Sequence, residues 1–136
     1  MIKLALLAVL MLVFVTGCAP SVGKPTVTGN VTYRERIALT PNAVVTVRIA
    51  DVSRADAPAT VIGEQVIKTE GKQVPIPFAV AYQAGDIEEG HRYSMQVRIE
   101  DGNGRLIYIS DTLIPVITMG SPTSGIEIVV VPVRGG

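Results

Sequence analysis

Valine and isoleucine make up most of the large aliphatic residues of this chain once its N-terminal segment is passed. Residues 18–136 contain 17 Val and 13 Ile but only 3 Leu. Such β-branched side chains are stiff at χ1 and pack well on the pleated surface of a sheet. In the same stretch, short runs alternate between apolar and polar residues and are separated by Gly, Pro, Asn and Asp. This pattern predicts an all-β domain over residues 27–134, a small β-sandwich or partly open barrel of roughly seven to eight mostly antiparallel strands.

Four of the expected strands show the alternation most clearly. They are residues 27–33, 44–52, 76–82 and 93–99. Pro75 and Pro77 lie on the polar side of the third run and cannot donate to a β-ladder, so this run is expected at the edge of a sheet. The apolar run at residues 60–69 is poorly phased, which predicts a β-bulge near Gly63. A last strand is expected at residues 125–133.

A β-hairpin is expected around the sequence Asp-Gly-Asn-Gly at residues 101–104. Two turn dipeptides between alternating runs are a strong local signal for a hairpin. A loop of two or four residues would place Leu106 and Tyr108 on the inner face of the sheet. A three-residue loop would place Ile107 and Ile109 there instead, and the sequence leaves both registers open.

The N-terminal segment has the layout of a bacterial secretory signal peptide. One lysine is followed by an uninterrupted apolar run at residues 4–15, which is shorter than the roughly 18–20 residues that a membrane-spanning helix needs. Cys18 comes directly afterwards in the sequence Val-Thr-Gly-Cys. This sequence resembles the lipobox of bacterial lipoproteins, in which an aliphatic residue, a small polar residue and Gly precede the invariant Cys. The alternative is a free Cys in an ordinary leader or membrane anchor.

The lipobox resemblance implies a specific processing of the chain. Residues 1–17 would be the signal peptide, cleaved between Gly17 and Cys18. The thiol of Cys18 would carry a diacylglycerol and its new amine a fatty acid such as palmitate. Residues 18–26 would then form a short tether that attaches the domain to the membrane. Asp after the lipidated Cys favours inner-membrane retention in this class, so Ala19 points to the periplasmic face of the outer membrane.

Composition leaves little room for catalytic or metal-binding chemistry. The 12 basic residues balance the 12 acidic ones, which argues against a nucleic-acid binder. There is one His, one Cys and no Trp. We expect His91 to be an exposed or edge residue, since zinc needs several N or S ligands. Asp86, Glu88 and Glu89 are too few for a calcium site and are expected on a solvated turn, within the only segment that could form a helical turn. The sequence therefore predicts no catalytic residues, no metal site and no cofactor.

Two charged segments remain, at residues 33–36 and 51–58. They are expected to be strand ends and solvated loops, and the alternative is that they form part of a partner-binding rim.

Four segments, taken in order, resemble the YbaY family of bacterial lipoproteins. They are residues 27–39, 51–58, 71–78 and 91–94. This family is part of the wider YscW-type group, which includes type III secretion pilotin lipoproteins, and the resemblance covers about residues 25–133. It implies a compact β-sandwich tethered to the outer membrane, without catalytic residues. Pilotins bind an outer-membrane secretin subunit and assist its localisation, and Cys18 matches the lipidated Cys of the family.

The functional prediction is a non-enzymatic, monomeric outer-membrane lipoprotein that binds or assists another component of the cell envelope. A secretin is a possible partner, and docking is expected along a strand edge or between the sheets, away from the edge that contains Pro75 and Pro77. The alternative is an envelope enzyme or a carbohydrate-binding lipoprotein. The absence of Trp argues against a stacking platform for sugars.

Overall fold

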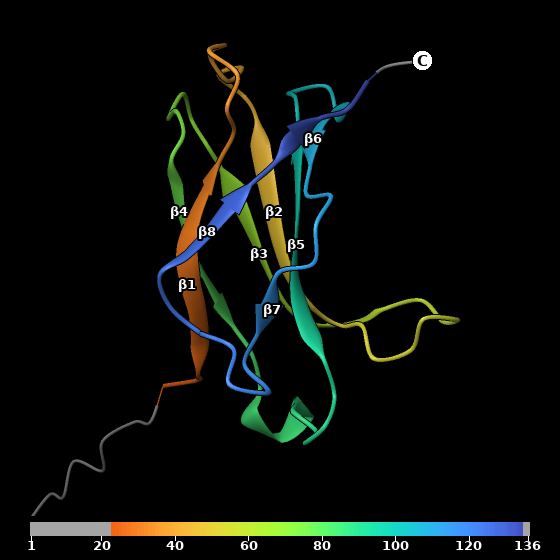
Figure 1. Cartoon of the computed structure of the whole chain (residues 1–136). Coiled ribbons are helices and arrows are strands. Elements are labelled where there is room, and N and C mark those ends of the chain that lie inside the picture. Colours follow the sequence, from red (N-terminus) through yellow and green to blue (C-terminus); the bar gives the residue numbers. More distant parts are fainter. Residues whose placement is uncertain (1–22, 135–136) are drawn as a thin grey trace, which may run out of the picture.

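Two β-sheets face each other in the computed structural model, which describes residues 23–134 (Figure 1). The smaller sheet has the strand order β4 (Ile76–Ala81), β1 (Thr26–Thr32) and β8 (Ile126–Val129). The larger sheet has the order β3 (Thr60–Lys68), β2 (Val44–Asp51), β5 (Tyr93–Glu100), β6 (Leu106–Ile109) and β9 (Val131–Pro132), and β7 (Pro115–Val116) pairs with the start of β5. Within the described residues the one helical element is a 3-10 turn, η1 (Ala84–Asp86). The prediction of an all-β sandwich is confirmed, and the sheets do not close into a barrel.

The core lies between the sheets and follows the alternation in the sequence. In β2, Val45, Val47 and Ile49 are fully buried. Val27 and Val31 of β1 are also fully buried and belong to the same cluster of apolar side chains. Burying a Val or Ile side chain stabilises the fold by roughly 1.5–3 kcal/mol relative to leaving it exposed. The aliphatic inner faces of the two sheets therefore hold the sandwich together.

Gly29 allows β1 and β8 to pair closely. These two strands run parallel, with Gly29 beside Ile126, whereas the other strand pairs of the described residues are antiparallel. A Cβ atom at position 29 would lie 1.9 Å from the carbonyl oxygen of Ile126 and 2.9 Å from the ring of Phe78. Any larger residue would push β8 away, so the position requires glycine.

The last predicted strand, residues 125–133, is divided between the two sheets. Its first part is β8 in the smaller sheet and its second part is β9 in the larger sheet. Val130 lies between them and donates its backbone N–H to the carbonyl oxygen of Thr32 at 2.8 Å. This division, together with the two-residue strand β7, gives nine strands within residues 23–134. The expected number of seven to eight was therefore too low, because the apolar run looks continuous although the chain changes sheets within it.

The predicted bulge in residues 60–69 is present. Ile49 pairs with Gly63 and the next residue, Ala50, pairs with Val61, so Ile62 is the extra residue. The bulge changes the phase of the side chains along β3. This explains the poorly phased apolar pattern in the sequence.

The hairpin between β5 and β6 contains a second bulge. Ile99 pairs with Tyr108 and Glu100 pairs with Leu106, so Ile107 is the extra residue. Tyr108 is buried on the inner face and Ile107 also packs against the core, whereas Ile109 is 40% exposed. Both registers considered from the sequence assumed an unbroken ladder, and the bulge makes each of them only partly correct.

Strand β4 lies at the edge of the smaller sheet, as its prolines predicted. Its outer side is covered by a side chain of β3, since the N–H of Ala79 donates to Oε1 of Gln65 at 2.8 Å. The inner face of β4 follows the predicted alternation, with Ile76, Phe78 and Val80 buried. The edges of β3 and β4 therefore protect each other on this side of the sandwich.

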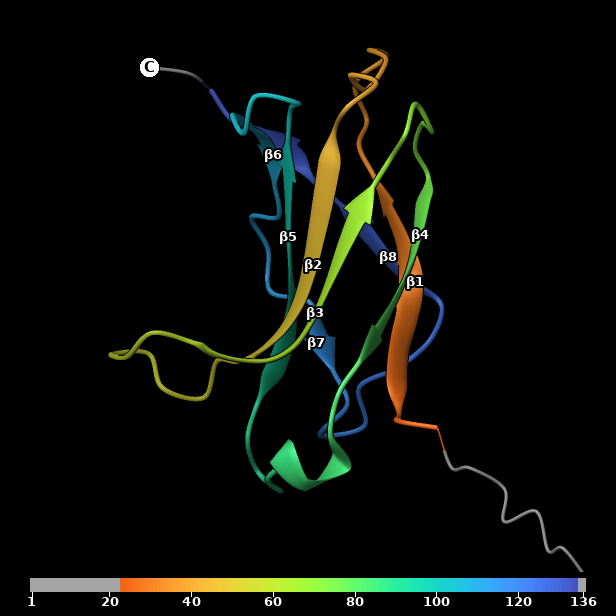
Figure 2. The same ribbon diagram turned by 180° about the vertical axis from the view of Figure 1, so that it is seen from behind.

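The loop between β2 and β3 projects from the side of the sandwich, as both views show (Figures 1 and 2). At the end of the sandwich where β1 begins lie η1 and the segment between β7 and β8 (Figure 2). Residues 23–134 contain no helix that is both long enough and apolar enough to cross a membrane.

Candidate functional site

His91 lies between two carboxylates at the turn before β5. Its Nδ1 is 2.6 Å from Oδ2 of Asp51, the last residue of β2, and its Nε2 is 2.8 Å from Oε2 of Glu88. The hydrogen bond with Asp51 raises the pKa of His91 above its ordinary value, burial works in the opposite direction, and the charge of Glu88 raises the pKa further. The side chain is 39% exposed. The sequence correctly predicted an accessible histidine, but it did not reveal the two partners.

Ser53 holds the other oxygen of Asp51. It donates its backbone N–H at 3.0 Å and its hydroxyl at 2.5 Å to Oδ1. The hydroxyl hydrogen bond from Ser53 is the largest cause that lowers the pKa of Asp51 to about 2, and the bond with His91 adds to it against the effect of burial. The Ser53 hydroxyl also accepts the N–H of Arg92 at 2.8 Å. These contacts, which we call the His91 network, connect the end of β2 to the start of β5.

The His91 network is not arranged as a catalytic triad. A triad places a hydroxyl nucleophile at the imidazole nitrogen that does not face the aspartate. In this chain that nitrogen meets Glu88, and the hydroxyl of Ser53 is bonded to Asp51 rather than to His91. Among residues 23–134, no group of three or more His, Cys, Asp or Glu side chains is placed to hold a metal ion. The network fits a structural connection between loops.

The acidic turn that the sequence singled out is held by Tyr93. The hydroxyl of Tyr93 donates to the carbonyl oxygen of Asp86 at 3.2 Å and accepts the N–H of Glu88 at 2.9 Å. Beside this turn is a hollow of about 590 Å³ that reaches the projecting loop after β2. Most of its polar lining groups come from the His91 network itself, so their hydrogen-bonding capacity is largely used within the protein.

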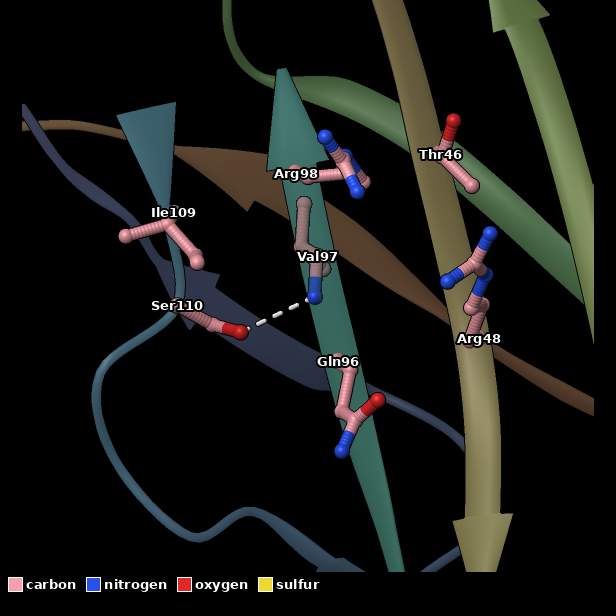
Figure 3. Close-up of a pocket in the computed structure, with 7 residues that line it drawn as sticks. All are labelled: Thr46, Arg48, Gln96, Val97, Arg98, Ile109 and Ser110. Carbon is pink, nitrogen blue, oxygen red and sulfur yellow. Dashed lines mark hydrogen bonds between the residues drawn. The ribbon is translucent and has the colours of Figure 1, made fainter. Parts of the chain in front are cut away.

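A smaller hollow of about 290 Å³ lies on the outer face of the larger sheet (Figure 3). Figure 3 shows Arg48 and Arg98 projecting from neighbouring strands, β2 and β5. Arg48 pairs with Glu64 at 2.5 Å and Arg98 with Glu100 at 3.0 Å. The hydroxyl of Ser110 accepts the N–H of Val97 at 2.9 Å (Figure 3). Because the two cations already have carboxylate partners, this surface is best described as a solvated sheet face.

An apolar groove lies beside the segment that connects β6 to β8. It has a volume of about 230 Å³ and is lined mainly by apolar atoms. Leu113 and Met119 on its rim are each 64% exposed. We call this surface the 113–119 groove; its lining residues are Val52, Arg92, Tyr93, Leu113, Pro115, Val116, Thr118, Met119 and Ser121. Met119 also borders a second hollow, of about 560 Å³, next to the acidic turn. Two large apolar side chains are thus displayed at one end of the sandwich.

The backbone of the groove is strained. Ile117 has a φ of 72° and Met119 a φ of 57°. A β-branched residue at positive φ is a genuine outlier, and such conformations cost about 1–3 kcal/mol. The hydroxyl of Thr118, between the two strained residues, donates to the carbonyl oxygen of His91 at 2.6 Å. The rest of the fold therefore holds this loop in a conformation that keeps Met119 exposed.

Residues 22–128 match a protein-family model, YscW, described as the type III secretion system lipoprotein chaperone. The chain belongs to the YscW family. It is also 37% identical over 115 residues to the uncharacterized lipoprotein YbaY of Escherichia coli (strain K12). That match covers 85% of this chain but only 59% of YbaY, so the chain spans less than two thirds of that relative. The resemblance to the YbaY and YscW-type lipoproteins that the sequence suggested is confirmed.

A solved structure supports the same family assignment at the level of the fold. The chain is similar to an alternative pilotin from the type II secretion system of Vibrio cholerae, with a TM-score of 0.77 and 49% sequence identity. The match covers 81% of this chain and 97% of the pilotin. The β-sandwich of this YscW-family chain is therefore shared with a protein described as a pilotin.

Two parts of the site differ in how far the sequence could reveal them. Cys18 and the bond between Gly17 and Cys18 lie outside the described residues, so cleavage and lipidation stay predictions of the sequence. The 113–119 groove was missed by the sequence analysis. The nearest signal is an apolar run interrupted by Pro115 and ended by Gly120, which predicts an irregular segment but not its exposure.

Proposed function

We propose that this chain is a non-enzymatic, pilotin-like chaperone of the outer membrane that binds an apolar segment of a secretin in the 113–119 groove. The observation that carries the proposal is the exposure of Leu113 and Met119 on a groove that a strained loop holds open. Membership of a family of lipoprotein chaperones and the likeness to a type II pilotin support it.

The anchoring part of the proposal rests on the leader. Residues 1–17 act as a signal peptide, and lipid on Cys18 holds the domain at the periplasmic face of the outer membrane. The tether expected at residues 18–26 is short: Thr26 already belongs to β1, and residues 19–25 can span at most about 25 Å when fully extended. A secretin in the same membrane would then meet the domain at a high effective concentration, so modest affinity in the groove would suffice.

The groove suits an apolar segment. Met is unbranched and polarizable, and it adapts to irregular partners. Burying a Leu or Met side chain that is now exposed contributes roughly 1.5–3 kcal/mol. Arg92 at the groove gives a polar contact that could orient the segment. Binding through a few apolar side chains also explains why a chaperone of this kind needs no reacting group.

The alternative of an envelope enzyme is less well supported. Its general base would have to be His91, and both ring nitrogens of His91 already face carboxylates. A hydrolase would need one of these nitrogens free for a nucleophile or a water molecule. The network is better explained as a support for the groove.

The test compares the full-length lipidated chain with Met119→Lys, and uses Val66→Lys as the matched control. Val66 is 56% exposed on β3, outside the lining of the groove. Binding to a C-terminal segment of a secretin, and delivery of that secretin to the outer membrane, are measured for each. We expect Met119→Lys to weaken binding by about tenfold or more, because the bound segment would then cover a charge in place of an apolar thioether. Equal effects of the two variants, or no binding by the unmodified chain, would contradict the proposal.

A further inference from the structure

Within the part of the chain that the structure describes, strand β8 has one edge that no other strand covers. It pairs with β1 alone, and it ends the three-stranded sheet. Val130, directly after β8, donates its N–H to the carbonyl oxygen of Thr32, the last residue of β1. Along a strand, the N–H and C=O groups of successive residues point to opposite edges. Since Val130 points toward β1, Glu127 and Val129 point their N–H and C=O groups away from β1. An uncovered edge of this kind is a template for pairing with a further strand.

The other long edges of the described residues are less accessible. The edges of β3 and β4 lie against each other, since Gln65 of β3 accepts the N–H of Ala79 and a Cβ at Gly63 of β3 would lie 2.6 Å from the carbonyl oxygen of Ala81. Pro77 in β4 also has no N–H to offer. At the opposite end of the larger sheet, β7 and β9 have only two residues each. Among residues 23–134, β8 is therefore the edge best suited to accept an added strand.

A hollow of about 380 Å³ borders this edge. Glu127 and Val129 line one side of it, and Asp111, Thr112 and Ile114 from the connection between β6 and β7 line another. Arg34, Glu35, Val130 and Val131 complete the lining. The hollow offers space beside β8 for an approaching chain and for its side chains.

Glu35, which lines this hollow, has one carboxylate oxygen without a hydrogen-bond partner among residues 23–134. Oε2 of Glu35 is buried and has no hydrogen bond within the described part of the chain. A buried acceptor without a donor is destabilising, and more so when it is charged. Three carboxylates, those of Glu35, Asp111 and Glu127, face the hollow against the single cation of Arg34. A positively charged hydrogen-bond donor, such as a Lys or Arg side chain, is the partner that these carboxylates would bind.

We propose that the free edge of β8 binds an extended polypeptide segment as an added strand, with a Lys or Arg of that segment reaching Glu35. Backbone hydrogen bonds to Glu127 and Val129 supply affinity that does not depend on sequence, and the carboxylates select a basic segment. A second copy of this chain fits less well, because pairing β8 with another β8 brings two Glu127 side chains onto the same edge. This site is separate from the 113–119 groove and goes beyond the proposed binding of a secretin there.

The experiment uses two synthetic seven-residue peptides that alternate Thr and Val and differ only in the central residue, Lys or Glu. Each is titrated into the full-length chain in detergent micelles, and amide hydrogen exchange is followed residue by residue. We expect the lysine peptide to bind about tenfold more tightly than the glutamate peptide and to slow exchange at the amides of Glu127 and Val129. Glu35→Gln should remove this preference, whereas the control Glu64→Gln on the outer sheet face should keep it.

Several outcomes would overturn the inference. They are equal affinity for the two peptides, unchanged exchange at Glu127 and Val129, or an unchanged preference in Glu35→Gln. Protection of these amides by raising the concentration of the chain alone would assign the edge to a second copy instead. Loss of peptide binding in Met119→Lys would assign the peptide to the groove. Secretin binding is measured separately, so failure here leaves the proposed function standing.

Discussion

The hydroxyl of Thr118 donates a hydrogen bond of 2.6 Å to the backbone carbonyl oxygen of His91. His91 is at the same time bound through its ring to Asp51 and Glu88. A short chain of contacts therefore runs from the end of β2, through the His91 network, to the strained loop that displays Met119.

The stability of the protein should depend on pH through His91. Its folded-state pKa is raised above the unfolded value, chiefly by the hydrogen bond with Asp51. The contribution of the charged imidazole is therefore fully present below the unfolded pKa of about 6.5, and it is lost as pH rises through the higher folded pKa. We expect His91→Gln to lower the free energy of unfolding more at about pH 6 than at about pH 9. Urea unfolding of the full-length chain and the variant at both pH values measures this difference.

The same assignment can be checked by proton NMR of the imidazole. Asp51→Asn removes a charged acceptor from Nδ1, so the pKa of His91 should fall relative to that of the unmodified chain. Gln65→Glu, at a position remote from His91, serves as a control for a change of charge elsewhere. An unchanged pKa of His91 in Asp51→Asn would show that the contact between the two side chains does not persist in solution.

Thr118→Val should loosen the 113–119 groove while keeping its shape. Valine has nearly the same volume as threonine but cannot donate to the carbonyl oxygen of His91. We expect a loss of about 1 kcal/mol in the free energy of unfolding and faster amide exchange at residues 117–120, because the positive φ angles of the loop are then less well supported. Thr112→Val, a substitution of the same kind at an exposed position, should change neither quantity. Equal exchange rates at residues 117–120 in the two variants would show that the hydrogen bond from Thr118 to His91 does not support the loop.

Gly29→Ala should be strongly destabilising. The added Cβ would lie 1.9 Å from the carbonyl oxygen of Ile126, so β8 must move away from β1. Overpacking of this kind costs typically about 1–3 kcal/mol and sometimes more. Gly85→Ala is the control, because a Cβ there meets no atom within 4 Å. The midpoints of thermal unfolding should differ clearly between the two variants, and similar midpoints would contradict the close pairing of β1 and β8.

Processing of the leader should leave Cys18 as the acylated N-terminal residue. Intact-mass analysis of membrane-extracted protein should show the loss of residues 1–17 and the gain of the lipid. Cys18→Ala should stay unprocessed or unlipidated and should no longer fractionate with the outer membrane. Retention of this variant in the outer membrane with an unchanged mass would disprove the lipobox interpretation.

The sequence predicted the inner faces of the strands well. Val45, Val47 and Ile49 alternate with polar residues, and the side chains of a strand point to opposite faces, so the pattern depends only on neighbouring residues. The edge position of β4 and the bulge beside Gly63 were also predicted, since proline and glycine limit the backbone locally. The phase of the hairpin could not be predicted, because the extra residue Ile107 is set by packing against the core.

By itself, the sequence determined that this chain has a short apolar leader before a single cysteine and an all-β domain after it. Both follow from local patterns of hydrophobicity and β-branching. Only the tertiary structure decided that the chain changes sheets at Val130, that His91 meets Asp51 from 40 residues away, and that Met119 stays exposed. These features depend on contacts between distant segments, and no short stretch of sequence carries the information about which segments meet.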